Sequence, residues 1–343
     1  MRVLDLRPWA VRIWSRRWDG EGRGAGGAGP TAWIADALLR RRVAGRESPP
    51  PGLAVVSVGN LAFGGTGKTP VVAALARALA AQGRAGGVLT RGYGSRRPGP
   101  LRVDPVDTGA GDEARLLART LAPCGWTVVQ ARDRAKGLEL IRQELPAGGV
   151  VILEDGHQTA KVGRHVDVLI LDRWRLAASP QGTVLRPRTG PVAPFGPWRE
   201  SASGAERAGI WLVESAEPPP RGTAGQTVAG FTRRLTLDAG AAVAAPDAPW
   251  VALSGIARPW VFEDGAARLR GSPAALAIRC ADHEPYAAAL RARVWRAIRE
   301  LGSPLTVTTE KDWIKLREGW PEDLPLAVAR QEVRWTGARA LPD

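Results

Sequence analysis

The stretch VVSVGNLAFGGTGKTPVVAALARALAAQG, residues 55–83, most constrains what this chain can fold into. An apolar, β-branched run enters a glycine-rich turn, and after Lys68 and Thr69 an alanine and leucine series follows at helical spacing. Glycines let such a turn point its N–H groups inward around an anion, and the N-terminal end of a helix attracts negative charge. The sequence therefore predicts a strand, a phosphate loop and a helix.

The residue types of this loop suit a nucleoside triphosphate. Lys68 is expected on the β- and γ-phosphates, and the Thr69 hydroxyl on Mg²⁺. The predicted nucleotide-binding residues are Gly64, Gly65, Thr66, Gly67, Lys68 and Thr69. The strict phosphate-loop pattern has glycine where Ala62 stands, and a glycine-rich turn with a surface lysine is the alternative. The loop predicts a nucleoside triphosphate with Mg²⁺ as ligands, but it does not define the reaction.

Composition narrows the class of protein. A chain of 343 residues can bury a large core and is long enough for two domains. Its two cysteines, Cys124 and Cys280, lie far apart, which excludes a disulfide framework and a C-x-x-C zinc site. The net charge of +14 comes mainly from arginine, which suits phosphates and anionic lipid headgroups or belongs to a solvated surface. We find no zinc finger, RNP-type aromatic motif or dense basic helix, so no nucleic-acid partner is expected.

The first eighteen residues, MRVLDLRPWAVRIWSRRW, combine tryptophan with arginine. On a helical projection Arg2, Arg12 and Arg16 lie opposite an apolar group, as in a helix lying in a bilayer interface. That group consists of Val3, Leu4, Val11, Trp14 and Trp18. Arg7 interrupts the apolar face and Pro8 disfavours helix before it, so a core helix or a poorly ordered arm remain alternatives. No apolar run is long enough for a spanning helix, and a signal peptide is not expected.

From residue 53 onward, β-branched runs alternate with helical patterns, which is typical of a parallel sheet buried on both faces. We predict an α/β fold similar to P-loop NTPases, with a doubly wound, mainly parallel sheet and a second, smaller α/β domain. The Pro-rich segment AEPPPRGTAG marks a linker. The predicted division is a basic, membrane-associating arm (1–50), a phosphate-loop nucleotide-binding domain (51–216) and a smaller C-terminal α/β domain (226–343).

Several acids and histidines are candidates for chemistry. Glu154 and Asp155 end the strand VVILED, where a phosphate-loop enzyme carries its Mg²⁺-binding acid, although acids at strand ends also serve as caps. Asp112 begins a helix, where capping by itself explains an acid. His283 stands beside Asp282, which could fix its tautomer.

The order of several motifs resembles the tetraacyldisaccharide 4'-kinase family, which acts in lipid A synthesis. These motifs are VGNLAFGGTGKTP, TRGYG, GDEARLLA, EDGHQ, SGIARP, ADHEPY and TTEKDWIKL, between residues 51 and 316. The family also lacks the first glycine of the strict loop. The resemblance implies transfer of the γ-phosphate of ATP to the 4'-hydroxyl of a tetraacylated glucosamine disaccharide 1-phosphate. It implies a glycolipid substrate and a place at the cytoplasmic face of the bacterial inner membrane, on anionic lipids.

The resemblance also assigns roles. Lys68 and Thr69 match the residues that hold phosphate and Mg²⁺, and Glu154 and Asp155 match the family's Asp-Asp pair. Asp112 matches the acid that activates the sugar hydroxyl. His283 matches a histidine of the second domain that supports this acid. The expected catalytic residues are therefore Asp112, His283 and Lys68, and the expected metal ligands are Thr69, Glu154 and Asp155.

Three positions depart from the family pattern. Glu154 is one carbon longer than the usual Asp, Thr159 replaces a histidine, and Ala114 replaces a proline after G-D-E. His157 is the residue that could substitute for the lost histidine. Two other functions are considered: a phosphate-loop kinase or ATPase acting on a soluble substrate, and a non-catalytic relative that binds nucleotide and membrane.

Overall fold

The computed structural model describes residues 1–8, 37, 41, 47–180, 182–193, 196, 198–223, 225–238 and 248–336. The chain divides into two compact units. The smaller unit comprises residues 1–19 and 234–332, and the larger comprises residues 20–233 and 333–343. The first residues thus group with the C-terminal segment, while the predicted boundaries at 216 and 226 stay a prediction.

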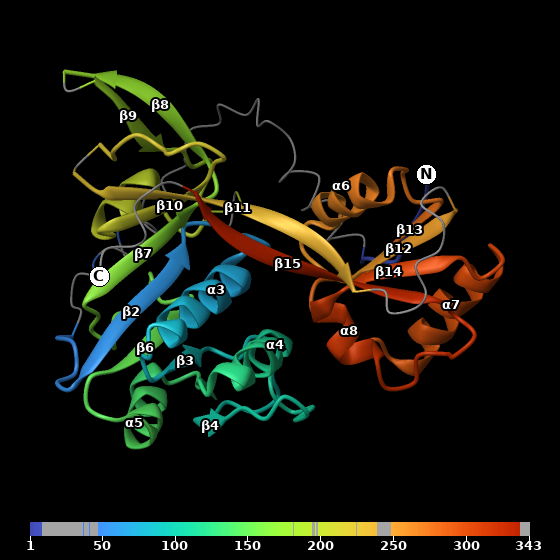
Figure 1. Cartoon of the computed structure of the whole chain (residues 1–343), viewed down its shortest axis with the longest axis horizontal. Helices are drawn as coiled ribbons and strands as arrows, with labels where there is room; N and C mark the ends of the chain where they lie inside the picture. Colours follow the sequence, from blue (N-terminus) through green and yellow to red (C-terminus); the bar gives the residue numbers. More distant parts are fainter. Residues whose placement is uncertain are drawn as a thin grey trace. The chain divides into compact units, whose positions relative to one another are not determined.

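The larger unit is built on a sheet in the strand order β11-β10-β7-β2-β6-β3-β5-β4 (Figure 1). Its pairs are parallel from β11 to β5, and only β4 pairs antiparallel. Its strands are β2 (Leu53–Asn60), β3 (Gly86–Thr90), β4 (Leu101–Arg102), β5 (Thr127–Gln130), β6 (Gly149–Glu154), β7 (Val166–Leu171), β10 (Ile210–Glu214) and β11 (Thr227–Asp238). A separate hairpin consists of β8 (Trp174–Ser179) and β9 (Gly182–Pro187).

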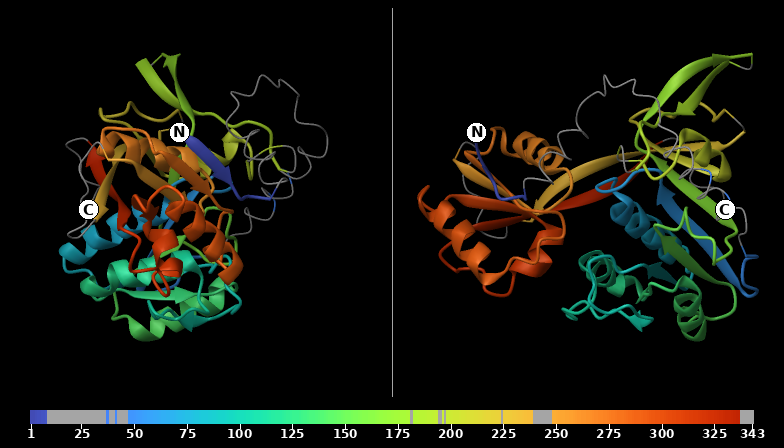
Figure 2. Two further views of the ribbon diagram at one scale, coloured as in Figure 1. Left: turned by 90° about the vertical axis from the view of Figure 1, so that its right-hand side faces the viewer. Right: turned by 180° about the vertical axis from the view of Figure 1, so that it is seen from behind.

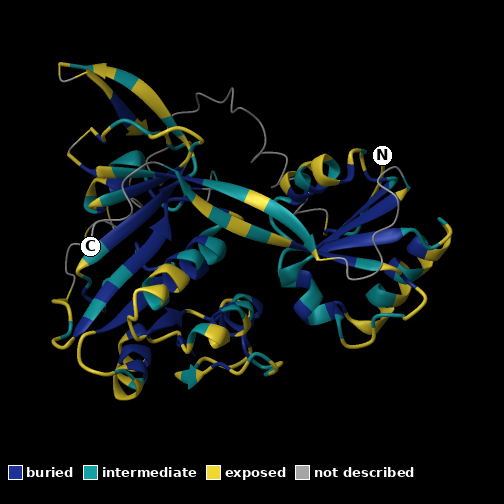
Figure 3. Cartoon of the chain, in the orientation of Figure 1, coloured by how far each residue is buried: buried dark blue, intermediate teal, exposed yellow. Residues whose placement is uncertain are grey.

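Helices cover both faces of this sheet. The helices are α3 (Lys68–Ala81), α4 (Asp112–Leu121) and α5 (Arg134–Glu144), with short 3₁₀ turns at Ala122–Cys124 and Ala202–Arg207. Ile152 packs with residues of α3 and α4, whereas its neighbour Leu153 packs with α5 on the opposite face. Because consecutive strand residues point to opposite faces, both faces of β6 are apolar and buried (Figure 3). The predicted doubly wound α/β fold is confirmed.

The strands of the smaller unit pair in parallel in the order β1-β13-β12-β14-β15. Its strands are β1 (Arg2–Asp5), β12 (Trp250–Ser254), β13 (Leu276–Arg279), β14 (Leu305–Thr309) and β15 (Leu326–Thr336). Its helices are α6 (Pro259–Arg270), α7 (Ala288–Arg299) and α8 (Glu310–Leu316). The strands β11 and β15 each have residues in both units. The predicted smaller α/β domain is present.

The helix considered for the first residues is wrong at Arg2–Asp5, which form strand β1. The Arg2 N–H donates to Ala275 O at 3.0 Å and the Leu6 N–H donates to Arg279 O at 2.8 Å. Pro8 disfavours helix before it, and the exposed edge of β13 supplies partners for an extended chain. Most of the remaining arm, with Trp14 and Trp18, lies outside the described residues. In the described part of the chain, no helix combines the length and apolar character needed to cross a membrane.

Candidate active site

The phosphate loop joins the end of β2 to the start of α3. Gly64, Gly65 and Gly67 have φ angles of 67°, 45° and 72°, a conformation that glycine adopts without strain. No side chain among the described residues caps the first N–H groups of α3. The Thr66 hydroxyl is buried and has no hydrogen-bond partner in the described structure. A buried hydroxyl without a partner, beside an uncapped helix start, fits a bound phosphate.

Lys68 points to the end of the neighbouring strand. Its Nζ lies 3.1 Å from Asn60 Oδ1 and 3.4 Å from Asp155 Oδ1. Arg199 Nη1 donates to both carboxylate oxygens of Asp155, at 2.9 and 2.8 Å. Burial alone would raise the pKa of Asp155, but Lys68 and Arg199 outweigh it and hold that pKa well below its usual value. Asp155 is therefore ionised and collects two cations of the kind that bind phosphate.

Glu154 ends β6 beside the first turn of α3. The Thr69 hydroxyl donates to Glu154 Oε1 at 2.8 Å. Burial raises the pKa of Glu154 to about 7, and the nearby Glu113 carboxylate adds to the rise, while hydrogen bonds from Thr90 and Thr69 oppose it. A divalent cation bound at Glu154 would relieve the repulsion between the Glu154 and Glu113 carboxylates.

These oxygen donors fit Mg²⁺. A hydroxyl and carboxylates are the hard ligands that this ion prefers, and Mg²⁺ held partly by nucleotide phosphates needs only one or two carboxylates. Among the described residues there is no group of three or more His, Cys, Asp or Glu that could hold a metal by itself. The Thr69 hydroxyl and the Glu154 carboxylate, which are in contact at 2.8 Å, are the donors that would hold the ion on the protein side.

Arg134 fixes the strand ends on which these acids stand. It is buried, and its guanidinium donates to Leu89 O and to Glu154 O, both at 2.6 Å. Burial lowers the pKa of Arg134 to about 10, against the opposing influence of Asp155 and Glu154. The guanidinium thus ties β3 to β6 at the carboxyl edge of the sheet.

Asp112 is the first residue of α4 and is buried. Its Oδ1 accepts the N–H of Glu113 at 3.0 Å, but the residue at the cap position is Gly111, and no side-chain cap hydrogen bond is made at α4 in the described structure. Residues of α4 pack in one core cluster with residues of α3, the helix that follows the phosphate loop. Asp112 therefore stands in the first turn of a helix that packs beside α3, where the helix dipole favours an acid, and its catalytic role stays a prediction.

Gln130, at the end of β5, holds two loops against this helix start. Its Nε2 donates to Ser95 Oγ at 2.9 Å and to Arg97 O at 2.8 Å. Its Oε1 accepts the N–H of Gly111, the residue before α4, at 2.8 Å. A Cβ on Gly92 would lie 2.0 Å from Gln130 Cδ, so only glycine permits this approach. Gln130 thereby positions the start of α4.

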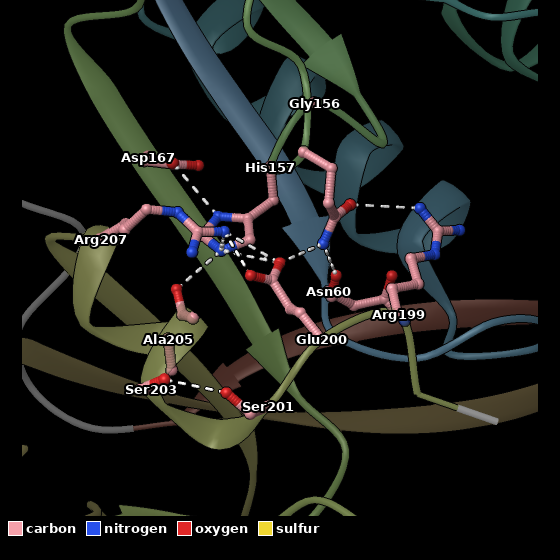
Figure 4. A network of polar contacts seen from close by, with 12 residues as sticks. Asn60, Gly156, His157, Asp167, Arg199, Glu200, Ser201, Ser203, Ala205 and Arg207 are labelled. Atoms are coloured by element: carbon pink, nitrogen blue, oxygen red, sulfur yellow. Dashed lines mark hydrogen bonds and ion pairs between the residues drawn. The ribbon is translucent and has the colours of Figure 1, made fainter. Parts of the chain in front are cut away.

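His157 does not lie with the predicted metal ligands. It is fully buried, with Nδ1 3.2 Å from Asp167 Oδ2 and Nε2 3.0 Å from Gly204 O (Figure 4). Arg207 Nη2 lies 3.1 Å from Nε2 and also donates to Glu200. The interpretation that His157 replaces the histidine lost at position 159 is therefore not supported by its position.

Gln158 connects this buried network to Asp155. Its Nε2 donates to Glu200 Oε1 and to Asn60 O, both at 2.8 Å. Its Oε1 accepts from Arg199 Nη1 at 3.2 Å (Figure 4). The same Arg199 nitrogen donates to Asp155. The Gln158 amide, which Glu200 and Asn60 hold in place, thus fixes the orientation of the Arg199 guanidinium.

His283 lies in the smaller unit with two charged neighbours. Lys311 Nζ donates to Asp282 Oδ1 at 2.9 Å and lies 3.2 Å from His283 Nε2. The His283 backbone has a φ of 60°, and its N–H donates to Asp282 Oδ1 at 3.0 Å. Asp112 belongs to the other unit, so the support of Asp112 by His283 stays a prediction.

The structure brings most of the predicted site together and adds residues that sequence reasoning missed. Asn60, Arg199 and Gln130 were not predicted. Arg233 was also missed, and its Nη1 approaches Thr66 O at 3.5 Å. Asn60 stood inside the quoted motif VGNLAFGGTGKTP, which was the available signal. Arg199 lies 44 positions from Asp155, and no spacing rule links them.

Comparison with known proteins identifies a family. The sequence model described as Tetraacyldisaccharide-1-P 4'-kinase matches residues 29–341. The chain is 35% identical over 305 residues to the tetraacyldisaccharide 4'-kinase of Phenylobacterium zucineum, covering 85% of each chain. It is 36% identical to the enzyme of Rhodospirillum rubrum, covering 87% of each.

Among solved structures, a crystal structure of LpxK from Aquifex aeolicus in complex with ATP is similar in fold. The TM-score is 0.64 at 23% identity, covering 89% of this chain and 93% of that one. Together with the match over residues 29–341, these findings show that the chain belongs to the tetraacyldisaccharide 4'-kinase family.

Proposed function

We propose that this lipid A 4'-kinase transfers the γ-phosphate of ATP to the 4'-hydroxyl of a tetraacylated glucosamine disaccharide 1-phosphate, using the edge of the sheet formed by β2, β3 and β6. The observation that carries the proposal is the meeting of Lys68 and Arg199 on Asp155, beside the uncapped start of α3. In this arrangement Asp155 holds Lys68 and Arg199 in place, and both cations can form new contacts with phosphate oxygens when ATP binds.

The loop and the two cations bind ATP. Backbone N–H groups of residues 64–67 and the Thr66 hydroxyl face the phosphates, and Lys68 neutralises the β- and γ-phosphates. Arg199 stabilises the charge that spreads over the transferred phosphoryl group. Asp155 keeps both cations aimed at the same point before ATP arrives, which reduces the reorganisation needed during transfer.

Thr69, Glu154 and Asp155 would hold Mg²⁺ together with the nucleotide. The ion supplies charge neutralisation between the β- and γ-phosphates when bound. Glu154 is positioned for this by its hydrogen bond from Thr69 and by the packing of β6.

Asp112 accepts the proton of the sugar hydroxyl. As the bond between the 4'-oxygen and the γ-phosphorus forms, the bond from that phosphorus to the β–γ bridging oxygen breaks, and ADP leaves with the electron pair. The proton moves from the 4'-oxygen to the Asp112 carboxylate. His283, with Asp282 and Lys311, supports Asp112 when the smaller unit meets the substrate.

The tetraacylated substrate requires contact with a bilayer. We place the chain peripherally on the cytoplasmic face of the inner membrane, with the arginine- and tryptophan-containing N-terminal arm on anionic lipids. Residues 6–50 supply this arm, because Arg2–Asp5 belong to β1.

The test is transfer of labelled γ-phosphate from ATP to a tetraacyl disaccharide 1-phosphate in mixed micelles. We expect one new phosphate on the lipid, located at the 4'-position by mass spectrometry after mild acid removes the 1-phosphate. Release of inorganic phosphate that is indifferent to the lipid would instead support an ATPase or a kinase for a soluble substrate. Tight binding of Mg-ATP without any turnover would support the non-catalytic relative.

A further inference from the structure

The hairpin β8–β9 has no role in the proposed transfer. It stands out from the body of the larger unit in all three views of the ribbon (Figures 1 and 2). The segment between Asp172 and Glu200, which contains the hairpin, has no Asp or Glu but five arginines. An isolated two-stranded hairpin has little stability of its own. We therefore expect a projecting hairpin that is rich in arginine and lacks acids to bind a partner.

The register of the hairpin gathers arginines on one face. Arg175 pairs directly with Arg186 across the two strands. The Arg188 N–H donates to Arg173 O at 2.9 Å, which extends the same register by one pair. Because residues two apart on a strand share a face, the four arginines lie on the same side of the hairpin. We call this side the arginine face.

The arginine face is unfavourable without an anion. All four of its arginines are exposed. Like charges placed directly opposite one another destabilise an antiparallel pair. Within the described residues we find no ion pair for Arg175, Arg186 or Arg188 that would offset this repulsion. The face therefore suits a partner that carries several negative charges.

The other side of the hairpin is apolar. Leu185 is fully buried and anchors the hairpin to a core cluster against which Trp174 also packs. Leu176 pairs with Leu185 but is 53% exposed. An exposed leucine at the level of the Arg175–Arg186 pair is the combination found in segments that enter a bilayer interface. A nucleic acid would match the charge but not the leucine.

We infer that the β8–β9 hairpin is a docking surface for anionic phospholipid headgroups, which its arginine face binds while Leu176 enters the interface. The inference rests on the proposed function in one respect, because an acylated substrate brings the enzyme to a bilayer. Because arginine side chains are long and flexible, those of the arginine face can reach headgroups while Leu176, on the opposite side of the hairpin, enters the interface. The hairpin thus gives the larger unit a membrane contact of its own, separate from the N-terminal arm.

The experiment is co-sedimentation of the full-length protein with vesicles of phosphatidylcholine alone or mixed with phosphatidylglycerol. In the double variant Arg175→Ser with Arg186→Ser, we expect binding to the mixed vesicles to weaken about 30-fold, since each arginine near such a surface contributes about 1 kcal/mol. Binding to pure phosphatidylcholine should change little. The conservative pair Arg175→Lys with Arg186→Lys should keep most of the binding, because headgroups require charge rather than a guanidinium.

The matched control removes the same charge elsewhere. Arg77 and Arg84 are exposed, on α3 and just after it. Arg77→Ser with Arg84→Ser should leave vesicle binding within a few-fold of the unmodified protein. Leu176→Ser should weaken binding by several-fold, and Leu269→Ser, at a leucine that is 44% exposed on α6, should not.

Two results would overturn the inference. One is a hairpin variant that stays folded by circular dichroism yet binds mixed vesicles as tightly as the unmodified protein or as the control pair. The other is tighter, Arg175- and Arg186-dependent binding to duplex DNA than to mixed vesicles. Phosphate transfer in mixed micelles is measured in parallel, because its absence in the unmodified protein would contradict the proposed function while leaving the vesicle result intact.

Discussion

Each compact unit places a carboxylate at the carboxyl end of a parallel strand, but the two carboxylates have different partners. Asp155 follows β6 in the larger unit and is held by Lys68 and Arg199. Asp312 follows β14 in the smaller unit and accepts the Gly255 N–H at 2.9 Å and, at 2.7 Å, a hydroxyl from the residue that ends β14.

The difference separates a functional acid from a structural one. Asp312 is completely buried, and its hydrogen bonds lock α8 to the loop after β12. The cation beside it, Lys315, stands on the same helix with Nζ 3.4 Å from Asp312 Oδ1, so losing either kind of partner would leave a buried acid unpaired. The side chain of Asp155 is 25% exposed, and its partners are two flexible cations that can move to another anion. A partly exposed carboxylate held by two cations beside an uncapped helix is typical of a phosphate site, whereas a fully buried one that accepts a backbone N–H and a hydroxyl is typical of a packing site.

The largest expected effect follows from removing Lys68, one of the two cations that Asp155 holds. Lys68→Ala should lower kcat for phosphate transfer roughly 100- to 1,000-fold, because a preorganised charge at the phosphates is lost. Lys136→Ala, at an exposed lysine of α5, is the matched control and should retain full activity. Equal activity of the two variants in the micelle assay would contradict the site assignment.

Replacing Asp155 and Asp312, each by asparagine, tests directly whether one acid is functional and the other structural. Asp312→Asn should destabilise the protein by about 2–3 kcal/mol, because hydrogen bonds to a buried charge are lost. Asp155→Asn, which tolerates the φ of 55°, should change the unfolding temperature little but lower kcat roughly 100-fold. Thermal unfolding and transfer rates measured side by side check this, and the opposite pattern would reverse the two roles.

Gln130 should affect catalysis through the position of α4. Gln130→Leu should lower kcat about 10- to 100-fold and leave KM for ATP nearly unchanged, because a small displacement of Asp112 disturbs the reacting geometry rather than nucleotide binding. Gln130→Glu keeps the acceptor for Gly111 and should recover part of the rate. Gln143→Leu, at an exposed residue of α5, is the control. A rise in KM for ATP with unchanged kcat would argue against the positioning role.

The smallest effect is expected at Glu154, where the sequence departs from its family. The longer side chain reaches the Thr69 hydroxyl at 2.8 Å. Glu154→Asp should therefore lower transfer by several-fold, and the addition of Thr159→His should not restore it. A double variant more active than the unmodified protein would show that the departures impair the enzyme.

The sequence predicted the parts of this site that are local in the chain. The strand, loop and helix from Val55 to Gly83 carry their own glycines, lysine and helical spacing, so residues 64–69 could be assigned before any contact was known. Glu154 was predicted as a metal ligand for a similar reason, because a buried strand that ends in acids is a recognisable pattern.

The parts that were missed depend on contacts between distant segments. Arg199 reaches Asp155 across 44 positions, and Gln130 joins two loops that only the fold brings together. The helix considered for the N-terminus was wrong at Arg2–Asp5, because the edge of β13 offers backbone partners that outweigh helical periodicity. These partners lie 274 positions away in the chain, as in the pair of Arg2 with Leu276. Local patterns predict elements, whereas pairing across the sheet decides which of them form.

The central claim is that nucleotide binding and proton acceptance are separate tasks of residues on α3 and α4. The most direct measurement compares Mg-ATP binding and single-turnover transfer to the tetraacyl disaccharide 1-phosphate in the unmodified protein, Lys68→Ala and Asp112→Asn. We expect Lys68→Ala to lose both ATP affinity and transfer, and Asp112→Asn to bind Mg-ATP normally while transfer falls at least about 100-fold. Transfer by Asp112→Asn at the rate of the unmodified protein would contradict the account.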